Sequence, residues 1–371
     1  MNIAVCVNTL SAGGAESFAV ALAIEYAKMG NKVIVVVHNI VDEKGEVLKS
    51  QLEAKNITLY NADIKHSYEK LILPLKYSQI FRIHKIEIIH SHLEQTDTYV
   101  LVSKLFYRKP HLIRTLHSKL PFSKYPHCIH RLLFKSFKFN IGCGDAMVND
   151  YYYADLRHNL IPINNGIDID CRSNVEKAEI RKKYRALLNI SHDDIVFLQV
   201  GTMSPRFGGV LTKGHDLSMA ALNKIKSSRI KFIFVGNNDE ASNARYYNQE
   251  FASDNRIIYT GIVGNVKDYI HTADVIIAPS RTEGLPISTM ECVVEGKPLI
   301  CSSIKQFSLF YTPATLVFDI TQIDSFVSCI NEMVNNYSDF LKSAEQQQVD
   351  YINRFSISRT AQEYLRIIDK L

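Results

Sequence analysis

The sequence predicts an α/β protein built from two doubly wound parallel sheets. Short apolar runs of strand length alternate with helical patterns along most of the 371 residues, which is typical of parallel sheets with crossover helices. A chain of this length can form two separate cores. A charged, helix-prone segment at residues 175–188 follows the first series of strands, so we place a first domain at residues 1–168 and a second at residues 169–355.

The composition excludes several classes of protein. No uninterrupted apolar run reaches the roughly 18 residues of a transmembrane helix, so we expect no membrane span. The N-terminus has no basic leader followed by a long apolar stretch, so we expect no signal peptide. The seven cysteines are scattered and contain no C-x-x-C pair. We therefore expect reduced thiols in a cytoplasmic protein, and neither a disulfide framework nor a zinc site.

The chain opens with a strand, a loop, a helix and a second strand. Residues 3–7 and 33–37 are apolar runs of strand length, and residues 15–29 have apolar side chains at helical spacing. The loop before this helix contains Gly13 and Gly14, which let the backbone approach an anion at the helix N-terminus. A simple tight turn explains the pair equally well. The loop does not match G-x-G-x-x-G and no acidic residue ends the second strand, so a dinucleotide site is disfavoured.

Two strands of the first half end in histidines. Helical patterns at residues 68–84 and 94–107 alternate with further predicted strands, at residues 57–60, 86–89, 111–115, 139–142 and 160–163. His92 and His117 come directly after two of these strands. Ligands bind at the carboxyl ends of strands in this architecture, so both histidines are candidate site residues. The alternative is that they are ordinary histidines near the surface.

Positive charge is concentrated between Asp97 and Asp145, a stretch without an acidic residue. Residues 130–139 interleave basic with large apolar side chains, a pattern that suits the headgroup region of an anionic bilayer. A core-facing helix with a solvated basic face is the alternative. Nucleic acid is not expected as a partner, because no recognisable nucleic-acid module accompanies the charge. We therefore expect a peripheral protein, attached at the inner face of the cell membrane through residues 119–138.

A second series of strands follows, at residues 195–200, 230–235, 257–260 and 275–278. Lys213 lies between a strand and a helix, where it can supply a point charge to a phosphate. Arg206 can supply a planar guanidinium group to the same phosphate. Asp168 and Asp170 form a D-x-D pair that can hold a divalent metal against a diphosphate. Such pairs arise easily by chance, so we expect neither a metal nor a cofactor.

The stretch from residue 274 to residue 298 predicts a strand, a loop and a helix. Glu283 lies in the loop and Glu291 inside the helix, which stops at Gly296. Backbone N–H groups at a helix start suit a phosphate, and carboxylates accept hydrogen bonds from hydroxyls. The pattern therefore predicts a nucleotide sugar as ligand. Residues 322–335, 339–353 and 356–371 are predicted helices, and the last has an apolar stripe that must dock on one of the domains.

The chain resembles the retaining glycosyltransferases of family 4. These enzymes have the GT-B architecture, in which two Rossmann-like domains face each other across a cleft that holds the active site. The resemblance extends over most of the chain and rests on five segments in order: Gly13-Gly-Ala-Glu16, Thr115-Leu-His117, Asn165-Gly-Ile-Asp168, Val200-Gly201 with Lys213-Gly214, and Pro279-Ser280 to Glu291.

The resemblance implies roles for the donor side of the site. Glu283 would contact the hydroxyls of the donor sugar, Glu291 the ribose and Lys213 the diphosphate, with Gly284 and Leu285 beside them. It implies that residues 1–168 form the acceptor-binding domain and residues 169–355 the nucleotide-sugar domain. Residues 356–371 would form a helix that crosses back to the N-terminal domain.

For the first domain, the resemblance implies that His117 acts near the reacting carbon and that Gly13 and Gly14 approach the donor phosphates. His92 and Glu16 are then candidates on the acceptor side. Retention in this family proceeds without a clear protein nucleophile, so Glu283 and Glu291 are not expected to work as a glycosidase pair.

One departure from the family pattern concerns Thr202, which stands where the family usually has arginine. Arg206 is a candidate substitute. The expected function is transfer of a sugar from a nucleotide-sugar donor to a lipid-linked or polysaccharide acceptor, in the biosynthesis of a cell-surface glycan such as capsule, O-antigen or exopolysaccharide. A nucleotide-sugar epimerase of the same fold and a non-catalytic nucleotide-sugar-binding protein are the alternatives.

Overall fold

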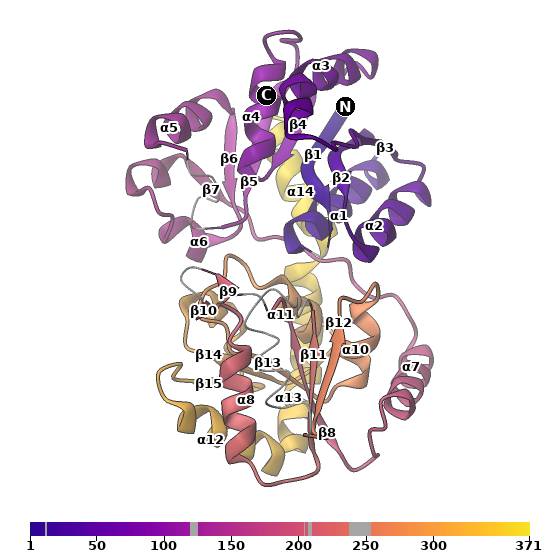
Figure 1. Cartoon of the computed structure of the whole chain (residues 1–371), viewed down its shortest axis with the longest axis vertical. Helices are drawn as coiled ribbons and strands as arrows, with labels where there is room; N and C mark the ends of the chain where they lie inside the picture. Colours follow the sequence, from indigo (N-terminus) through magenta and orange to yellow (C-terminus); the bar gives the residue numbers. More distant parts are fainter. Residues whose placement is uncertain (12, 119–124, 204, 207–209, 237–253) are drawn as a thin grey trace. The chain divides into compact units, whose positions relative to one another are not determined.

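The chain forms two compact units, each with its own sheet. The computed structural model describes residues 1–11, 13–118, 125–203, 205–206, 210–236 and 254–371 (Figure 1). The first unit comprises Met1–Asp168 and Phe355–Leu371, and the second comprises Ile169–Arg354. Within the described ranges, no helix combines the length and the apolar character that a bilayer crossing requires. The seven cysteines are free.

The sheet of the first unit has the strand order of a Rossmann fold. Its strands are β1 (Asn2–Leu10), β2 (Lys32–Ile40), β3 (Thr58–Asn61), β4 (Ile88–His92), β5 (His111–Leu116), β6 (Phe139–Gly142) and β7 (Leu160–Pro162). They pair in parallel in the order β3-β2-β1-β4-β5-β6-β7. The order reverses between β1 and β4, and ligands of doubly wound sheets bind at the carboxyl ends of the strands beside such a reversal.

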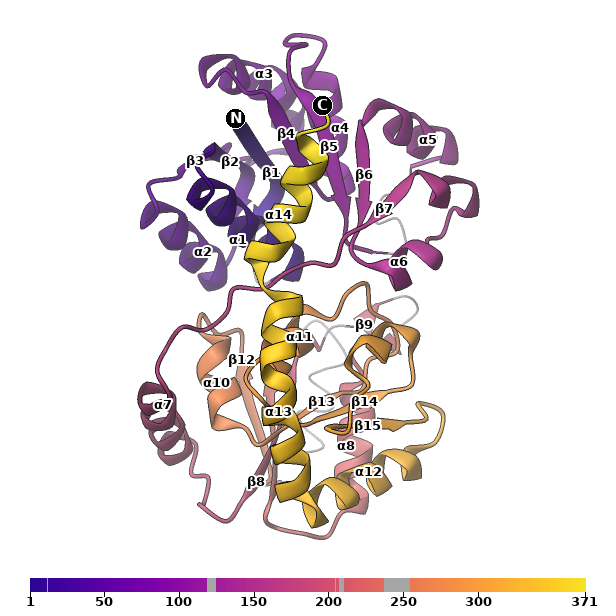
Figure 2. The same ribbon diagram turned by 180° about the vertical axis from the view of Figure 1, so that it is seen from behind.

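Helices cover both faces of this sheet (Figures 1 and 2). They are α1 (Gly14–Lys28), α2 (Glu43–Glu53), α3 (Leu73–Ile83), α4 (Glu94–Ser103), α5 (His127–Ser136), α6 (Asp145–Asn149) and α14 (Ile357–Ile368), with 3-10 turns η1 (Ser67–Ile72) and η2 (Ala154–Asn159). Figure 2 shows α14, in yellow, lying across the sheet beside α1. Its stripe of Ile357, Ala361, Tyr364 and Ile368 is buried there. The backbone of Ile357 also bonds to Ile167, at 2.9 Å.

The basic segment around α5 is a core-facing helix with a basic outer face. Leu133, Phe134 and Phe137 are buried, whereas Arg131 and Lys135 are exposed. These three apolar side chains therefore fill the core of the first unit and do not face a bilayer, whereas Leu132 of the same helix is 51% exposed. The remaining part, residues 119–124, lies outside the described residues.

The second unit repeats the doubly wound order. Its strands are β8 (Ile195–Val200), β11 (Ile230–Val235), β12 (Ile257–Gly261), β13 (Val275–Ala278), β14 (Leu299–Ser302) and β15 (Thr315–Phe318). They pair in the order β12-β11-β8-β13-β14-β15, so this sheet reverses between β8 and β13. A short antiparallel ribbon of β9 (Pro205–Arg206) and β10 (Val210–Leu211) follows β8.

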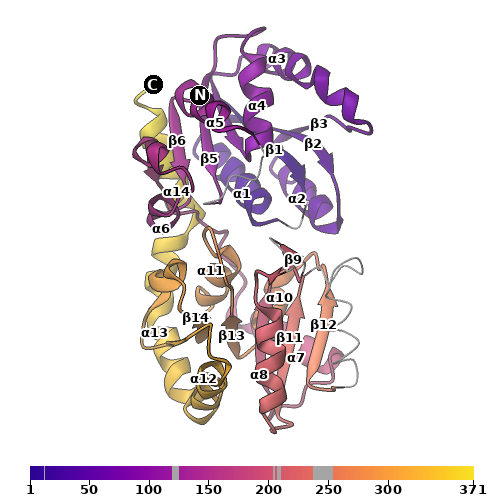
Figure 3. The same ribbon diagram turned by 60° about the vertical axis from the view of Figure 1, so that its left-hand side comes forward.

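Helices also cover both faces of the second sheet. They are α7 (Asn174–Leu187), α8 (His215–Lys224), α10 (Val266–Thr272), α11 (Ile287–Val293), α12 (Ile323–Asn335) and α13 (Tyr337–Phe355), with a 3-10 turn η3 (Lys305–Phe310). Figure 1 shows α8 in front of the sheet, and Figure 2, seen from behind, shows α13 on the opposite face. In Figure 3, α12 lies between α13 and α8. The strands β14 and β15 are absent from the prediction. Each has only four residues, and a short apolar run cannot be assigned by periodicity alone.

Buried ion pairs fix α7 to the second sheet. Asp274, at the amino end of β13, accepts hydrogen bonds from Arg181 and Arg185 of α7. It also accepts one from the backbone N–H of Val196 on β8, at 2.8 Å. The Asp274 side chain is only 7% exposed, so the two guanidinium groups supply the positive charge that its burial requires.

Candidate functional site

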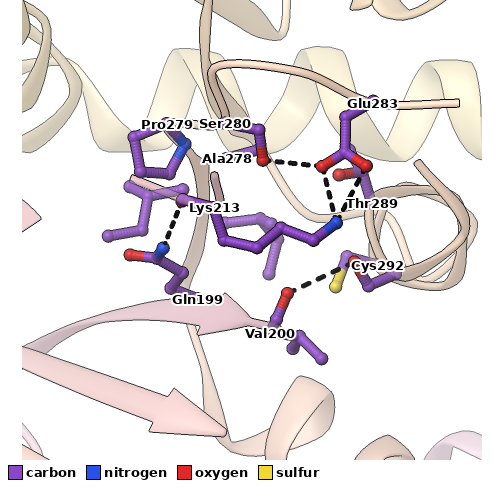
Figure 4. Close-up of a pocket in the computed structure, with 12 residues that line it drawn as sticks. Gln199, Val200, Lys213, Ala278, Pro279, Ser280, Glu283, Thr289 and Cys292 are labelled. Carbon is purple, nitrogen blue, oxygen red and sulfur yellow. Dashed lines mark hydrogen bonds and ion pairs between the residues drawn. The ribbon is translucent and has the colours of Figure 1, made fainter. Parts of the chain in front are cut away.

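The reversal of the second sheet brings Lys213 and Glu283 together. Lys213 lies before α8, in the connection that follows β8, and Glu283 lies in the loop between β13 and α11. The Lys213 ammonium is 2.7 and 2.8 Å from the two carboxylate oxygens of Glu283 (Figure 4). Glu283 is 9% exposed and Lys213 is 29% exposed, so the pair lies in a pocket that is still open to solvent.

The backbone around Lys213 is held in place by a glycine and a glutamine. Gly214 has φ +70°, and a Cβ there would lie 2.0 Å from the carbonyl oxygen of Pro279. Only glycine allows this approach, which brings the start of α8 against the end of β13. The Gln199 amide on β8 donates to the Lys213 carbonyl at 2.8 Å and accepts from Ser218, at 2.6 Å. The lysine is therefore positioned before any ligand arrives.

Glu283 is positioned by the strand end beneath it. The Ser280 hydroxyl donates to one carboxylate oxygen of Glu283 at 2.6 Å, as Figure 4 shows. The Ser280 carbonyl accepts from Ser302 on β14, at 2.6 Å. A ligand with a negative group and adjacent hydroxyls could replace the Lys213–Glu283 pair with two separate charge-assisted interactions. A phosphate would take the lysine and a polyol would take the carboxylate.

The other predicted donor residues are near this pair or outside the described side chains. Gly284 and Leu285 follow Glu283 in the same loop, and Glu291 lies on α11 beside the pocket-lining residue Cys292. Arg206 belongs to β9, and its side chain lies outside the described residues.

In the first unit, three histidines stack at the carboxyl ends of β4 and β5. His90 and His92 have ring centroids 4.3 Å apart, and the His92 and His117 rings are 5.3 Å apart. His92 Nδ1 lies 3.0 Å from His117 Nε2, and Asn165 Nδ2 lies 3.4 Å from His117 Nδ1. Phe18 of α1 packs edge-on against His92 and His117. The sequence placed His92 and His117 at the ends of two strands, and the structure pairs these strands and brings the two rings into contact.

Hydrogen bonds tie this histidine stack to α1 and α14. His90 lies between the Tyr26 hydroxyl, at 3.2 Å from Nδ1, and the Thr115 hydroxyl, at 2.8 Å from Nε2. The Tyr364 hydroxyl lies 2.9 Å from that of Thr115. His92 Nε2 is fully buried and has no hydrogen-bond partner among the described residues, which is unusual for a buried polar atom.

The glycine loop of the first unit holds its own carboxylate. Gly13 caps α1, and a Cβ at Gly13 would lie 1.9 Å from Oε2 of Glu16. The Glu16 carboxylate therefore lies against Gly13. Burial raises the pKa of Glu16, with Ser11 and the helix backbone opposing the rise. An anion that approached Gly13 and Gly14 would have to displace this carboxylate or meet it protonated.

Comparisons with known proteins agree with this arrangement. A profile described as Glycosyltransferase Family 4 matches residues 12–170, and one described as Glycosyl transferases group 1 matches residues 195–336. The chain is a family 4 glycosyltransferase. This family is a retaining one, and the two sheets described above are those of the GT-B fold.

Individual relatives are distant. The O-antigen biosynthesis glycosyltransferase WclY of Escherichia coli is 26% identical over 300 residues, which cover 77% of this chain and 80% of that protein. A UDP-Gal:alpha-D-GlcNAc-diphosphoundecaprenol alpha-1,3-galactosyltransferase of Escherichia coli is 20% identical over 268 residues, which cover 68% of this chain and 67% of that protein. The crystal structure of Anabaena HepE in complex with UDP and glucose has a TM-score of 0.82, covers 100% of this chain and 99% of that one, and is 18% identical. At that identity the likeness shows the fold alone.

The D-x-D pair of this glycosyltransferase is part of an ion-pair network. Arg172 donates to the Asp170 carboxylate at 2.7–3.0 Å, and His271 Nε2 lies 2.9 Å from it. Asp170, His271 and Glu295 have ligand atoms within 4.8 Å of one another. However, Arg172 and Lys177, which is 2.7 Å from Glu295, already pair with the two carboxylates. We therefore infer no metal site from this group.

The structure adds residues that the sequence did not assign. Gln199 and Ser280 position the Lys213–Glu283 pair, and Tyr26 and Tyr364 bond to the histidine stack through their hydroxyls. Gln199 had a signal in the sequence, because it is polar inside an otherwise apolar strand. The two tyrosines fit the apolar stripes of their helices, so nothing in the pattern distinguished them from core residues.

Acid should destabilise the first unit of this glycosyltransferase. Burial lowers the pKa of His90 to about 3 and that of His117 to about 4, and it lowers the pKa of His92 well below 6.5. The unfolded chain takes up protons below pH 6.5 that the folded stack cannot take up. The free energy of unfolding should therefore fall as the pH falls from about 6.5, by up to about 1.4 kcal/mol per pH unit for each histidine.

Chemical denaturation at several pH values between about 7.5 and 5.5 measures this slope. Asp97 and Glu16 oppose it, because burial raises the pKa of both carboxyls, to about 6 for Asp97. Burial also lowers the pKa of His38 to about 4, which adds to the effect of the stack. His90→Gln should reduce the slope, whereas His192→Gln should not, since the His192 side chain is fully exposed. A free energy of unfolding that is constant over this range would contradict the assignment.

Proposed function

We propose that this glycosyltransferase moves a sugar, with retention, from a nucleotide-sugar donor to a lipid-linked or polysaccharide acceptor in the assembly of a cell-surface glycan. The Lys213–Glu283 pair supports a nucleotide sugar as the donor, because Lys213 can bind a diphosphate and Glu283 can accept hydrogen bonds from sugar hydroxyls. The names of the relatives support the acceptor class. One is an O-antigen enzyme, one acts on a sugar-diphosphoundecaprenol, and a third, CapH of Staphylococcus aureus, belongs to capsular polysaccharide biosynthesis.

In this proposal the second unit binds the donor. Lys213 binds the diphosphate and offsets the charge that develops on it as the glycosidic bond breaks. Glu283 accepts hydrogen bonds from the donor sugar, with Gly284 and Leu285 beside it, and Glu291 binds the ribose. Arg206 takes the place of the arginine that the family has at position 202.

The first unit binds the acceptor in this proposal. His117 acts on the sugar near the reacting carbon and exchanges its long 3.4 Å contact with Asn165 for a sugar hydroxyl. Gly13 and Gly14 let the donor phosphates approach once the Glu16 carboxylate has moved away from Gly13, and His92 and Glu16 line the acceptor side. The final helix, α14, holds this arrangement through Tyr364.

The roles of Lys213 and Glu283 can be separated by thermal unfolding with ligands. A panel of UDP, GDP and ADP, each tested alone and as its glucose conjugate, should contain one nucleotide that raises the unfolding temperature. At a hundredfold excess over Kd the rise should be roughly 5–10 °C. Glu283→Ala should keep the shift caused by the nucleoside diphosphate, because Lys213 is then free to bind phosphate. It should lose the additional shift caused by the sugar.

Turnover decides between the proposal and its alternatives. Incubation with the stabilising nucleotide sugar and a membrane extract should release the nucleoside diphosphate. Isomerisation of the donor without any acceptor would indicate an epimerase, and binding without turnover would indicate a non-catalytic protein. No stabilisation by any nucleotide would count against a donor site at Lys213.

We also propose that the enzyme works in the cytoplasm, at an anionic membrane surface where lipid-linked acceptors are found. The exposed basic side chains Arg131, Lys135 and Lys138 support this location, because anionic lipids attract such groups within a Debye length. Cosedimentation of the activity with anionic vesicles at low salt, and not with neutral vesicles, checks it.

A further inference from the structure

Aromatic side chains gather in the first unit around the amino end of α5. The His127 ring stacks on Tyr153, with ring centroids 4.5 Å apart and an interplanar angle of 28°. Tyr152 packs edge-on against Tyr153 at 4.9 Å and is 60% exposed. We call His127, Tyr152 and Tyr153 the aromatic platform. Its rings combine apolar faces with polar tips, which suits a ligand that has both apolar and polar groups.

Buried polar groups lie directly behind the aromatic platform. The His130 ring is 4.9 Å from that of Tyr153 and is fully buried, and neither ring nitrogen is hydrogen-bonded to a side chain in the described ranges, although the Tyr125 backbone beside it acts to raise its pKa. The Tyr151 hydroxyl is also buried, 6.3 Å from Tyr153 between ring centroids, and likewise finds no partner in the described ranges. Buried polar groups normally have a partner, so these groups are placed for a ligand or an ordered water.

The charges around the aromatic platform favour a ligand with hydroxyls over an anion. The Glu94 carboxylate, at the start of α4, lies 3.5 Å from His130 Nδ1, and Asp155 lies beside the platform. Burial lowers the pKa of His130 in spite of Glu94, so this imidazole is neutral at pH 7. Arg114 is paired with Asp97 at 3.1 Å. The Arg157 guanidinium also lies here and donates to the Tyr151 carbonyl at 2.8 Å. Two carboxylates against this one guanidinium leave a negative balance, and carboxylates accept hydrogen bonds from hydroxyls but repel phosphates.

We infer that the aromatic platform and the polar groups behind it form a subsite for a neutral sugar ring of the acceptor. The Tyr153 ring, which covers His130, turns outward and stacks on the C–H face of the sugar, whose hydroxyls then bind Glu94, His130 and the Tyr151 hydroxyl. Both α4 and α5 follow strands of the first sheet, so their amino ends lie at the sheet edge where ligands bind. This inference rests on the proposed function in taking the sugar to be part of the acceptor.

Saturation-transfer NMR on the full chain tests the subsite without any nucleotide. The probes are the methyl glycosides of glucose, galactose and N-acetylglucosamine at millimolar concentration. We expect saturation transfer to the ring C–H protons of at least one glycoside. Tyr151→Phe is the sharpest variant, because it removes a hydroxyl with no partner among the described residues. It should weaken binding roughly two- to tenfold and leave the unfolding temperature unchanged or higher.

Tyr153→Ala removes the stacking surface and should weaken binding roughly two- to tenfold. Tyr68→Ala is its matched control, because Tyr68 is 67% exposed and stacks on His66 at 5.3 Å, at η1 of the same unit. This control should bind the glycosides as the unaltered protein does.

Three results would overturn the subsite. They are saturation transfer to none of the glycosides, unchanged binding in both Tyr151→Phe and Tyr153→Ala, and displacement of the glycoside by inorganic phosphate. Unchanged binding in the two variants would assign the buried polar groups to ordered water. Stabilisation by nucleotides is measured separately, by thermal unfolding. If no nucleotide stabilises the protein but a glycoside still binds, the proposed donor site is refuted and the subsite is supported.

Discussion

Replacing Lys213 with methionine should lower kcat/KM for the donor by about 10²–10³-fold. The variant keeps the length of the side chain and removes the only charge that the structure places against Glu283 in the described pocket. The leaving diphosphate would then lose its positive partner. It would also meet a carboxylate that is only 9% exposed and no longer neutralised. Release of nucleoside diphosphate from the donor identified by thermal unfolding measures the effect.

Lys224→Met is the matched control for Lys213→Met. Lys224 also forms a pair, at 2.6 Å from Asp324, but the two side chains are 47% and 81% exposed and lie outside the pocket. Loss of this exposed pair should change kcat/KM less than about twofold. In the double variant Lys213→Met with Glu283→Gln, the two losses should not add, because the two residues share one ligand and one ion pair. Retention of more than about a tenth of kcat/KM by Lys213→Met would remove Lys213 from the proposed diphosphate site.

Replacing Asp274 with alanine should lower the free energy of unfolding of the second unit by about 3–5 kcal/mol. The substitution leaves Arg185, which is only 9% exposed, without its carboxylate partner and also removes the partner of Arg181. The backbone N–H of Val196 loses its side-chain acceptor as well. Denaturation followed by hydrogen exchange in β8 and β13 measures the loss in the relevant unit.

The control for Asp274→Ala is Asp324→Ala, which breaks the exposed pair with Lys224 and should cost less than about 1 kcal/mol.

Asp274 lies at the amino end of β13, and Glu283 follows the carboxyl end of the same strand. Below its unfolding transition, Asp274→Ala should therefore keep the kcat/KM of the unaltered enzyme. If Asp274→Ala and Asp324→Ala lowered the free energy of unfolding equally, the buried ion pairs of Asp274 would stabilise the fold no more than an exposed pair does.

The sequence was sufficient to predict the strands and helix ends that have a clear local pattern of apolar residues or a stop residue such as glycine. Residues 139–142, 195–200, 230–235 and 275–278 were predicted as strands and form β6, β8, β11 and β13 with the same limits. Gly296 was predicted to end a helix and has the left-handed φ of +68° that such a stop uses. The strands β14 and β15 were missed, because they are short and stabilised by neighbouring strands more than by their own pattern.

The candidate site was predictable only one residue at a time. The sequence placed Lys213, Glu283, His92 and His117 at strand ends, because polar residues after apolar runs are visible in any single chain. It could not show that Lys213 contacts Glu283, since that contact depends on β8 lying next to β13. It also assigned Lys213 and Glu283 to different parts of one ligand and gave no sign that the two side chains bind each other.

The hydrogen bond between Thr115 and Tyr364 joins residues 249 positions apart, and it has a consequence for synthesis. Domains fold as the chain leaves the ribosome, at about 5–20 residues per second. The first unit therefore waits roughly 10–40 seconds after Asp168 has been made before Phe355–Leu371 arrive. Until then α1 and β5 expose the surface that α14 will cover. A chain that stops before Tyr364 lacks this hydrogen bond to Thr115, so translation must pass Tyr364 before the first unit is finished.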